Sequence, residues 1–173
     1  HVPFSSMQVP LVHIEQAGVD LLKSSRSIHV TPDCLTSGIV QPFELACGAH
    51  PGIISDMQAF YVMLGLAASG TSRIFDYRYP ERIAFVHELA KLVEGDHLQA
   101  ERGKITVHGP ATFKSGVADS TDLRGSMAAV IAALCAPGQS KILNVQMALR
   151  GYNDLNGKLS KLGARVSIFE ENA

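Results

Sequence analysis

Residues 55–74 read SDMQAFYVMLGLAASGTSRI. A hydroxyl residue and an aspartate open this stretch, an apolar run follows, and small residues with a glycine precede a basic residue and an isoleucine. Hydroxyl and carboxylate side chains favour the position just before a helix, where they accept hydrogen bonds from free N–H groups of the first turn. Glycine just past a helix end lets the chain turn into the next strand. The stretch therefore predicts a helix that runs directly into a strand.

The same plan recurs at residues 121–142, which read TDLRGSMAAVIAALCAPGQSKI. A second pattern, a helix that ends at a glycine and continues into a strand, recurs at residues 15–30, at 91–107 and, in a shorter copy, at 161–168. Internal repeats with alternating helices and strands indicate sheets covered by helices. We therefore predict an α/β (α+β) fold that repeats a roughly α-β-β-α-β unit, and a single domain over residues 1–173.

The remaining elements follow from local patterns. Apolar residues at helical spacing predict amphipathic helices around residues 9–17, 83–93 and 152–162. Short runs rich in β-forming residues predict strands at residues 39–45, 73–77, 141–145 and 165–169.

Charge and hydropathy exclude several classes of protein. The formal net charge of -1 gives no electrostatic reason to expect nucleic acid or an anionic membrane as a partner. The longest apolar stretch, residues 57–69, is too short to cross a bilayer. The first thirty residues also lack the basic start and apolar run of a signal peptide. We therefore expect a protein that binds neither nucleic acid nor membrane.

Cysteine and histidine usage gives no sign of a metal or a cofactor. The histidines show no HxxxH or HExxH spacing, and glycine-rich phosphate loops are absent, so we expect no metal site and no cofactor. The three cysteines form no CxxC pair, which favours buried thiols in a reduced, cytoplasmic setting. The chain begins with His1 rather than Met, so we expect a fragment, a processed product or an excised domain.

Four residues near the predicted helix ends could carry chemistry. Asp56 and Asp122 occupy the same place in the two repeats, and each follows a hydroxyl residue. Both could simply cap their helices, or the two helix starts could converge on one anion-binding cleft, with Arg124 as a fixed cation. Arg150 lies at a strand-to-helix turn, where an arginine is either a surface residue or a bidentate clamp for carboxylate or phosphate.

The segment HPGIISDMQA, residues 50–59, resembles the HPG-x-x-TDMQA segment of the UDP-N-acetylglucosamine enolpyruvyl transferases. The likeness is strong again at TDLRGS, residues 121–126, which is similar to the family's TDLR-A-S. It extends over nearly the whole chain, in order, through shorter matches at residues 81–82, 86–89, 150–152 and 158–164.

The resemblance implies a fold and an activity. The family has two domains, each built from three βαβαββ units in an inside-out α/β barrel, with the active site between them. This chain would supply most of one domain, about two and a half units. The family moves enolpyruvate from phosphoenolpyruvate to a hydroxyl of UDP-N-acetylglucosamine through a tetrahedral intermediate and releases phosphate, a step of peptidoglycan precursor synthesis. The expected partners are these two substrates and the N-terminal-type domain, in the same chain or in a second one.

The resemblance also implies roles for the residues that match. Asp56 corresponds to a carboxylate near the acceptor hydroxyl, a candidate general base. Asp122 would belong to the network that handles protons. Arg124 and Arg150 would belong to the cationic cluster around the phosphoenolpyruvate anions, so Asp56, Asp122 and Arg150 are the expected catalytic residues.

The nucleotide-sugar side of the resemblance is weaker. Arg78 and Tyr79 fall where the family contacts the nucleotide-sugar, and Arg82 belongs to the same expected substrate-binding set. However, residues 78–81 read RYPE in place of the family's VFEN. Residues 147–153 keep the arginine of the family's HIDRGYE and lose its histidine and acidic neighbours.

Three hypotheses remain at this point. The chain is half of an enolpyruvyl transferase site and inactive alone, because nothing in it matches the other domain's reactive-cysteine loop or lysine–asparagine pair. Alternatively, it belongs to a related transferase of secondary metabolism or of the shikimate type, with another acceptor. Finally, it is a degenerate module that binds without catalysing.

Overall fold

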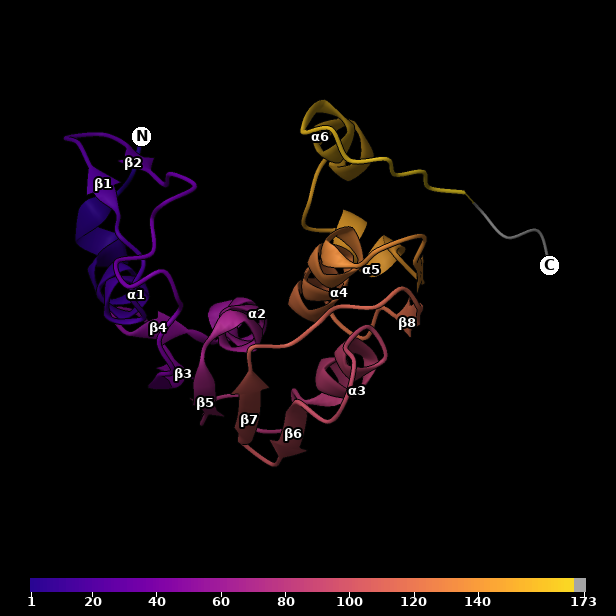
Figure 1. The fold of residues 1–173 in the computed structure, drawn as a ribbon, viewed down its shortest axis with the longest axis horizontal. Coiled ribbons are helices and arrows are strands. Elements are labelled where there is room, and N and C mark those ends of the chain that lie inside the picture. Colours follow the sequence, from indigo (N-terminus) through magenta and orange to yellow (C-terminus); the bar gives the residue numbers. More distant parts are fainter. Residues whose placement is uncertain (170–173) are drawn as a thin grey trace.

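A computed structural model describes residues 1–169 of the chain as a U-shaped molecule whose two arms rise from a central sheet (Figure 1). The central sheet has five strands in the order β4-β3-β5-β7-β6. Their bounds are Ile53–Ile54 for β4, Glu44–Gly48 for β3, Gly70–Asp76 for β5, Lys104–Gly109 for β7 and Leu98–Glu101 for β6. β3 runs parallel to β4 and β5, whereas β7 is antiparallel to β5 and β6, so the sheet is mixed.

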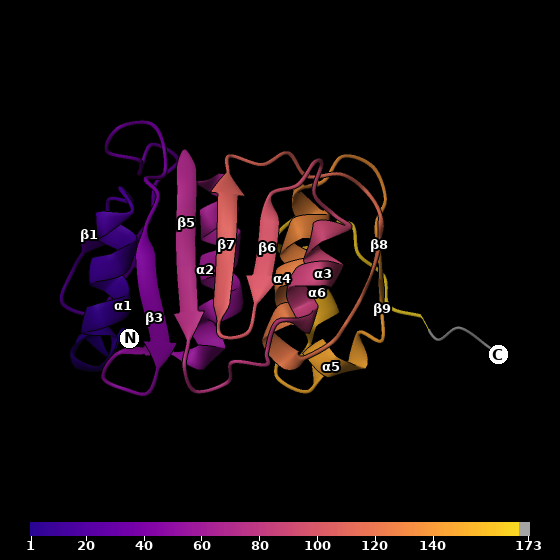
Figure 2. The ribbon, with the colours of Figure 1, turned by 90° about the horizontal axis from the view of Figure 1, so that it is seen from below.

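Two helices pack close to this sheet (Figure 2). α2 (Gln58–Ala67) lies against β5 and β7, and α3 (Ala84–Ala90) lies near β6. A short 3₁₀ turn, η1 (Ser55–Met57), connects β4 to α2. Mixed sheets covered by helices confirm the predicted α/β class.

The arms carry the remaining elements (Figure 1). The N-terminal arm consists of α1 (Phe4–Gln16) and the two-stranded pair β1 (Leu22–Lys23) and β2 (Ile28–His29). The C-terminal arm holds α4, a parallel pair of strands and two short helices. Its elements are β8 (Val117–Asp119), α4 (Leu123–Cys135), β9 (Lys141–Leu143), α5 (Gln146–Leu149) and α6 (Leu155–Lys161).

The core lies between α2 and the central sheet. Val62 and Leu66 of α2 are fully buried, as are Ile74 of β5 and Val107 of β7. Each such side chain contributes about 1.5–3 kcal/mol by leaving water. Gly65 allows this close approach, because a Cβ there would lie 3.2 Å from the Val107 side chain. The helix that carries the 55–74 sequence is therefore fixed tightly on the sheet.

Most predicted elements are present. The helices expected around residues 9–17 and 83–93 are α1 and α3, and the strands expected at 73–77 and 141–145 are β5 and β9. The strand expected at 39–45 begins only at Glu44, after Pro42, which has no N–H to give to a ladder.

At the C-terminal end the predicted helix is present as α6, whereas two details of the prediction differ from the structure. The strand predicted at residues 165–169 is wrong, because this segment pairs with no strand of residues 1–169. The apolar face predicted for residues 152–162 is only partly buried: Leu155 is buried in α6, but Leu162 is 83% exposed.

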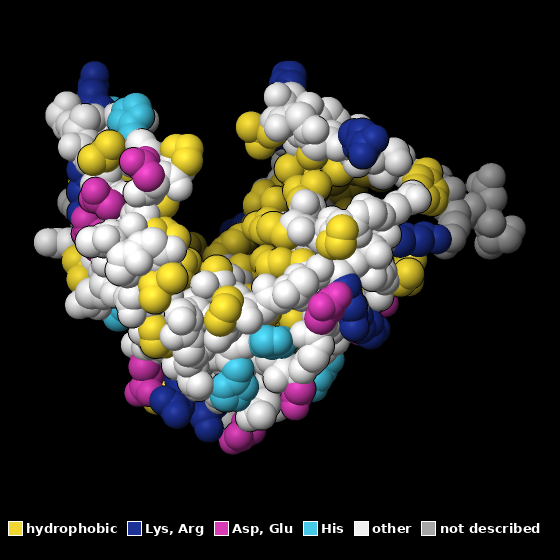
Figure 3. Space-filling model, in the orientation of Figure 1, with side chains coloured by type: hydrophobic (Ala, Val, Ile, Leu, Met, Phe, Trp, Pro, Cys, Tyr) yellow, Lys and Arg dark blue, Asp and Glu magenta, His cyan; other side chains and the backbone are white. Residues whose placement is uncertain are grey.

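An open groove lined by both polar and apolar residues borders Leu162. It has a volume of about 1970 Å³ and lies between α4, β9, α6 and residues 164–169. Val130, Leu134 and Leu159 are among its lining residues. Figure 3 shows hydrophobic side chains gathered along the inner side of the C-terminal arm. No helix within residues 1–169 has the length and hydropathy that a membrane crossing requires.

Candidate functional site

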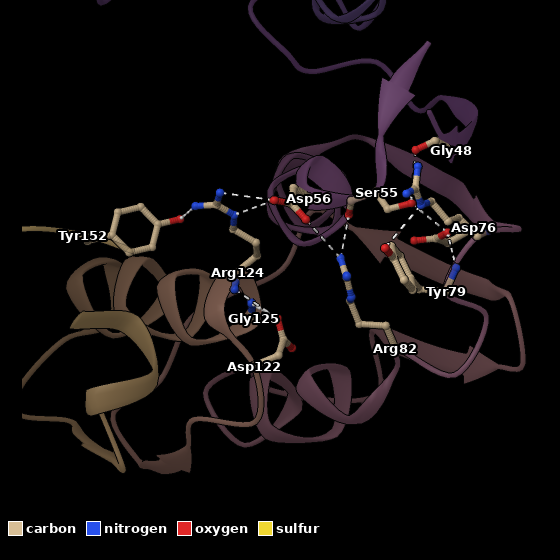
Figure 4. A network of polar contacts seen from close by, with 11 residues as sticks. Gly48, Ser55, Asp56, Asp76, Tyr79, Arg82, Asp122, Arg124, Gly125 and Tyr152 are labelled. Atoms are coloured by element: carbon tan, nitrogen blue, oxygen red, sulfur yellow. Dashed lines mark hydrogen bonds and ion pairs between the residues drawn. The ribbon is translucent and has the colours of Figure 1, made fainter. Parts of the chain in front are cut away.

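The carboxylate of Asp56 lies between two arginines that come from distant parts of the chain (Figure 4). Arg124 donates from Nε and Nη2 to Asp56 Oδ2, at 3.3 and 3.2 Å. Arg82 donates from Nη1 to Asp56 Oδ1 at 3.5 Å and to the Ser55 carbonyl at 3.2 Å. The three elements that meet here are η1, the start of α4 and the segment before α3.

These ion pairs stay partly open to solvent. The side chain of Asp56 is 45% exposed, and those of Arg82 and Arg124 are 25% and 29% exposed. Ion pairs with this degree of exposure contribute roughly 0–1 kcal/mol to stability. The cluster therefore adds little to the fold, and a ligand can reach all three charged groups from solvent.

A tyrosine supports the arginine on the α4 side. Arg124 donates from Nη1 to the Tyr152 hydroxyl at 2.9 Å, and its guanidinium lies 5.5 Å from the centre of the Tyr152 ring. The hydrogen bond to Tyr152, and to a smaller extent the contact with Asp56, raise the pKa of Arg124 above its ordinary value. The guanidinium is therefore a permanent cation with a fixed orientation.

A second tyrosine supports the arginine on the other side. The guanidinium of Arg82 stacks 4.4 Å from the centre of the Tyr79 ring, and that of Arg78 lies 5.4 Å from the same centre. Arg78 also donates from Nε to the Tyr79 hydroxyl at 3.3 Å. The Tyr79 ring thus contacts both guanidinium groups, which the electron-rich ring attracts.

Asp122 caps α4. Its Oδ1 accepts hydrogen bonds from the backbone N–H groups of Arg124 at 3.0 Å and of Gly125 at 2.9 Å. The backbone of Asp122 is extended, as a cap residue requires. Asp56 makes no such cap, because neither η1 nor α2 has a side-chain hydrogen bond at its N-terminus. Of the two interpretations of the paired aspartates, capping therefore describes the contacts of Asp122 alone.

Arg150 stays apart from the cluster in the described part of the chain. It is exposed at the end of α5, and within residues 1–169 its side chain makes no hydrogen bond or ion pair. Its neighbour Gly151 packs on the start of α4, since a Cβ there would lie 2.8 Å from the Leu123 side chain. The backbone of Arg150 is therefore close to the N-terminal end of α4, while its side chain remains available.

Sequence reasoning missed two contributors to this arrangement. Asp76 is fully buried at the end of β5, and its Oδ1 accepts hydrogen bonds from Ser55 Oγ and from the backbone N–H groups of Arg78 and Tyr79. Tyr152 was predicted only as part of an apolar helix face. A charged residue at the end of an apolar β-run was the single available signal for Asp76.

The described residues form no metal site, and of the three expected buried thiols only Cys47 is buried, whereas Cys34 is half-buried and Cys135 is exposed. No group of histidine, cysteine and acidic side chains within residues 1–169 could hold a metal ion. The three cysteines are free thiols. Burial, with a further contribution from Asp76, raises the pKa of Cys47 to about 12, so that thiol stays protonated and unreactive.

Known proteins share this sequence and fold. Residues 2–159 match the model of the family described as EPSP synthase (3-phosphoshikimate 1-carboxyvinyltransferase). A UDP-N-acetylglucosamine 1-carboxyvinyltransferase 2 of Streptococcus thermophilus is 32% identical over 171 residues, which are 99% of this chain and 39% of that protein. A UDP-N-acetylglucosamine 1-carboxyvinyltransferase of Chlorobium phaeovibrioides is 34% identical over 160 residues, 92% of this chain and 36% of that protein.

A solved structure agrees with these matches. The enolpyruvyl transferase NikO from Streptomyces tendae superimposes with a TM-score of 0.81 and 26% sequence identity, over 92% of this chain and 36% of that one. The resemblance read from residues 50–59 and 121–126 is thereby confirmed. The chain spans about two fifths of the length of the curated relatives that it matches.

Proposed function

The chain belongs to the EPSP synthase family, and on that basis we propose that it forms one wall of an enolpyruvyl transferase active site. The donor is phosphoenolpyruvate, and the acceptor is a hydroxyl of a UDP-N-acetylglucosamine-like molecule. The observation that carries the proposal is the Asp56 carboxylate, which lies partly exposed between Arg82 and Arg124. A carboxylate beside fixed cations suits a reaction that deprotonates a hydroxyl next to a multiply charged anion.

The proposed reaction has two steps. In the addition step the acceptor oxygen bonds to C2 of phosphoenolpyruvate, the acceptor loses its hydroxyl proton, and C3 gains a proton. In the elimination step the C2–O bond to phosphate breaks, and C3 loses a proton. Asp56 accepts the hydroxyl proton, and Asp122 belongs to the network that relays protons. Arg124 and Arg150 stabilise the carboxylate and phosphate charges of phosphoenolpyruvate.

The nucleotide-sugar contacts belong to the opposite side of the same cluster. Arg78, Tyr79 and Arg82 form a stack that presents two guanidinium groups and a phenol ring. Guanidinium groups bind phosphate oxygens in a bidentate manner. This stack therefore has the chemistry to bind the diphosphate of a nucleotide-sugar beside Asp56, on the side of Arg82.

We propose further that residues 1–173 are most of one domain and that a second, N-terminal-type domain completes the site. The length of the relatives supports this division, since the chain spans only 39% of the Streptococcus thermophilus protein. A cytoplasmic location follows from the proposed substrates.

The chain alone is expected to be inactive. Much of the rate gain in such reactions comes from groups fixed on both sides of the substrates, and this chain provides one side. Incubation of the chain alone with phosphoenolpyruvate and UDP-N-acetylglucosamine should release no phosphate above the protein-free rate. Phosphate release that depends on the chain would overturn the half-site proposal.

The role of Asp56 is tested in the full-length parent. Asp56→Asn should lower kcat about 100-fold or more, because the candidate general base is lost. Glu15→Gln is the matched control, since Glu15 pairs with Lys23 on the N-terminal arm and the charge change is the same. If Asp56→Ala and Arg150→Ala both leave transfer intact, the chain is a degenerate binding module and the catalytic proposal fails.

A second acceptor class is favoured by one observation. The RYPE segment at residues 78–81 places a tyrosine between two arginines, where the resembling family has VFEN. A transferase of the shikimate type or of secondary metabolism could use that surface for another acceptor. Titration of the full-length parent with UDP-N-acetylglucosamine, shikimate 3-phosphate and free nucleosides separates the two proposals by which ligand binds most tightly.

A further inference from the structure

We propose that Asp76 is a positioning residue that sets the orientation of Asp56 through Ser55. The inference rests on the proposed function only for the identity of the ligand, because the geometry of the three residues is independent of it. Asp76 is fully buried and has no proposed contact with a substrate. It acts by fixing two chain segments that carry opposite members of the Asp56–Arg82 pair.

One carboxylate oxygen of Asp76 binds both the Ser55 side chain and the backbone of residues 78–79. Asp76 is fully buried at the end of β5, and its Oδ1 accepts three hydrogen bonds. The donors are Ser55 Oγ at 3.0 Å, the Arg78 N–H at 2.9 Å and the Tyr79 N–H at 2.9 Å. The strand end itself is fixed by a bond from the Asp76 N–H to the Gly103 carbonyl at 3.0 Å. The oxygen therefore has a defined place in the fold.

Each of these bonds leads to one side of the ion pair. Ser55 precedes Asp56 in η1, so the bond to Ser55 Oγ fixes the turn on which the Asp56 carboxylate stands. Tyr79 leads into Arg82, whose own N–H donates to the Tyr79 carbonyl at 2.9 Å. The guanidinium of Arg82 then returns to the Ser55 carbonyl. Asp76, Ser55 and Arg82 thus close a loop of contacts around Asp56 (Figure 4).

A purely structural role does not account for the carboxylate. An asparagine would offer the same acceptor oxygen to the three donors without burying a charge. Asp76 instead keeps a second oxygen, Oδ2, that is buried and has no partner in the described chain. A buried carboxylate oxygen without a partner costs free energy. The contacts of Oδ1 therefore carry the inference, because they tie the segment of Asp56 to the segment of Arg82.

The opposite side of the cluster is held independently. Arg124 is positioned by the Asp122 cap at its backbone and by Tyr152 at its side chain. Loss of the Asp76–Ser55 bond should therefore move Asp56 and leave the Arg124–Tyr152 contact in place. This asymmetry gives the proposal a local signature that general destabilisation does not produce.

The test uses Ser55→Ala, which removes the hydroxyl contacts with Asp76 Oδ1 at 3.0 Å and with the Gly48 carbonyl at 3.4 Å, and Ser55→Thr, which keeps the hydroxyl. The chain is studied without ligand by NMR, following the Asp56 side-chain carboxyl ¹³C signal and the Arg124 Nε–Hε signal. Ser55→Ala should shift both signals toward the positions of solvent-exposed groups, and Ser55→Thr should restore them. Thr71→Ala, which removes a hydroxyl bonded to His108 at the other end of β5, is the control and should leave both signals unchanged.

Ligand binding gives the second readout. Ser55→Ala should weaken UDP-N-acetylglucosamine binding to the full-length parent about tenfold, because Arg82 and Asp56 on the acceptor side lose their fixed positions. Ser55→Thr should bind as the unaltered protein does. Asp76→Ala, which removes the acceptor oxygen, should reproduce the Ser55→Ala shifts of the Asp56 signal, and if that variant does not fold, the two Ser55 variants decide.

The outcomes separate this inference from the proposed function. Unchanged Asp56 and Arg124 signals in Ser55→Ala would overturn the positioning role, as would a Ser55→Thr variant that fails to restore them. If the signals shift as expected but the unaltered parent does not bind UDP-N-acetylglucosamine, the positioning role stands and the proposed function fails.

Discussion

The two helix entrances of the molecule have the same sequence plan and use it differently. Ser55–Asp56 and Thr121–Asp122 each place a hydroxyl residue and an aspartate before an apolar helix. In the second entrance a carboxylate oxygen of the aspartate accepts hydrogen bonds from backbone N–H groups of α4. In the first, the aspartate accepts no hydrogen bond from a backbone N–H group of its helix and instead accepts hydrogen bonds from two arginines. One motif therefore produces a helix cap in one place and an uncapped carboxylate that contacts two arginines in the other.

The backbone conformation decides between these uses. Asp122 has φ -156° and ψ 170°, the extended conformation from which a side chain can turn back to the next N–H groups. Asp56 lies inside the 3₁₀ turn η1, so its own residue is already helical and its side chain points outward. Ser55 is fixed by Asp76 at this point, which keeps the turn in place. At these two entrances the aspartate caps the helix only where its own backbone is extended.

The largest change in the free energy of unfolding should come from adding a side chain at the glycine of the second entrance. Gly125 corresponds to Ala59 of the first, and a Cβ at Gly125 would overlap the Phe85 side chain and Asp122 Oδ2. We expect Gly125→Ala to lower the free energy of unfolding by about 3 kcal/mol, the upper range for overpacking. Urea denaturation measures it.

The matched change at the first entrance is Ala59→Gly, which should cost only about 1 kcal/mol through helix propensity. Equal losses for the two variants would mean that both entrances are packed alike, contrary to the structure.

A smaller effect should follow from removing each aspartate in turn. Asp122→Ala should lower the free energy of unfolding by about 1 kcal/mol, because two N–H groups of α4 lose their cap. Asp56→Ala should change it by less than about 0.5 kcal/mol, since a partly exposed ion pair contributes little. Thermal or urea unfolding of the two single variants gives the comparison, and a reversed order would show that the capping assignment is wrong.

The smallest effect concerns pH and the support of the second entrance. Glu88 of α3 accepts a hydrogen bond from the Asp119 N–H of β8 at 2.8 Å, just before that entrance. Hydrogen bonds from Lys91, first, and from the Asp119 N–H hold the pKa of Glu88 below its ordinary value of 4.5. A carboxyl whose pKa is lower in the folded state stabilises the fold above about pH 4.5, and this contribution is lost as the pH falls through the folded pKa.

The unfolding free energy of the chain should therefore fall between pH 5 and pH 3 by more than that of Glu88→Gln, which cannot titrate. Denaturant titrations at several pH values measure the difference between the two slopes. Identical slopes would show that the Glu88 carboxylate does not stabilise β8.

Local sequence patterns predicted much of the fold. The 55–74 and 121–142 stretches each contain a helix followed by a strand, as predicted, because cap residues, apolar spacing and helix-ending glycines act within a few residues of one another. The strand predicted at 165–169 failed for the complementary reason. A strand needs a partner, and its own residues do not reveal whether one is present in the described chain.

The site shows the same division. Asp56, Arg82 and Arg124 were all candidates from the sequence, but no local pattern could say that Arg124 reaches across 68 residues to Asp56. The supporting contacts of Tyr152 with Arg124 and of Asp76 with Ser55 span 28 and 21 residues. Such contacts depend on the relative positions of whole elements, which side-chain chemistry alone does not fix.

The sequence by itself thus determined the helix–strand units, the family likeness and the residue types available for an anion site. Only the tertiary structure decided which aspartate caps a helix, which one faces the arginines, and which buried carboxylate orders them. The physical reason is range: helix signals act over one or two turns, whereas an ion pair forms only where separate elements bring their charges within a few ångströms.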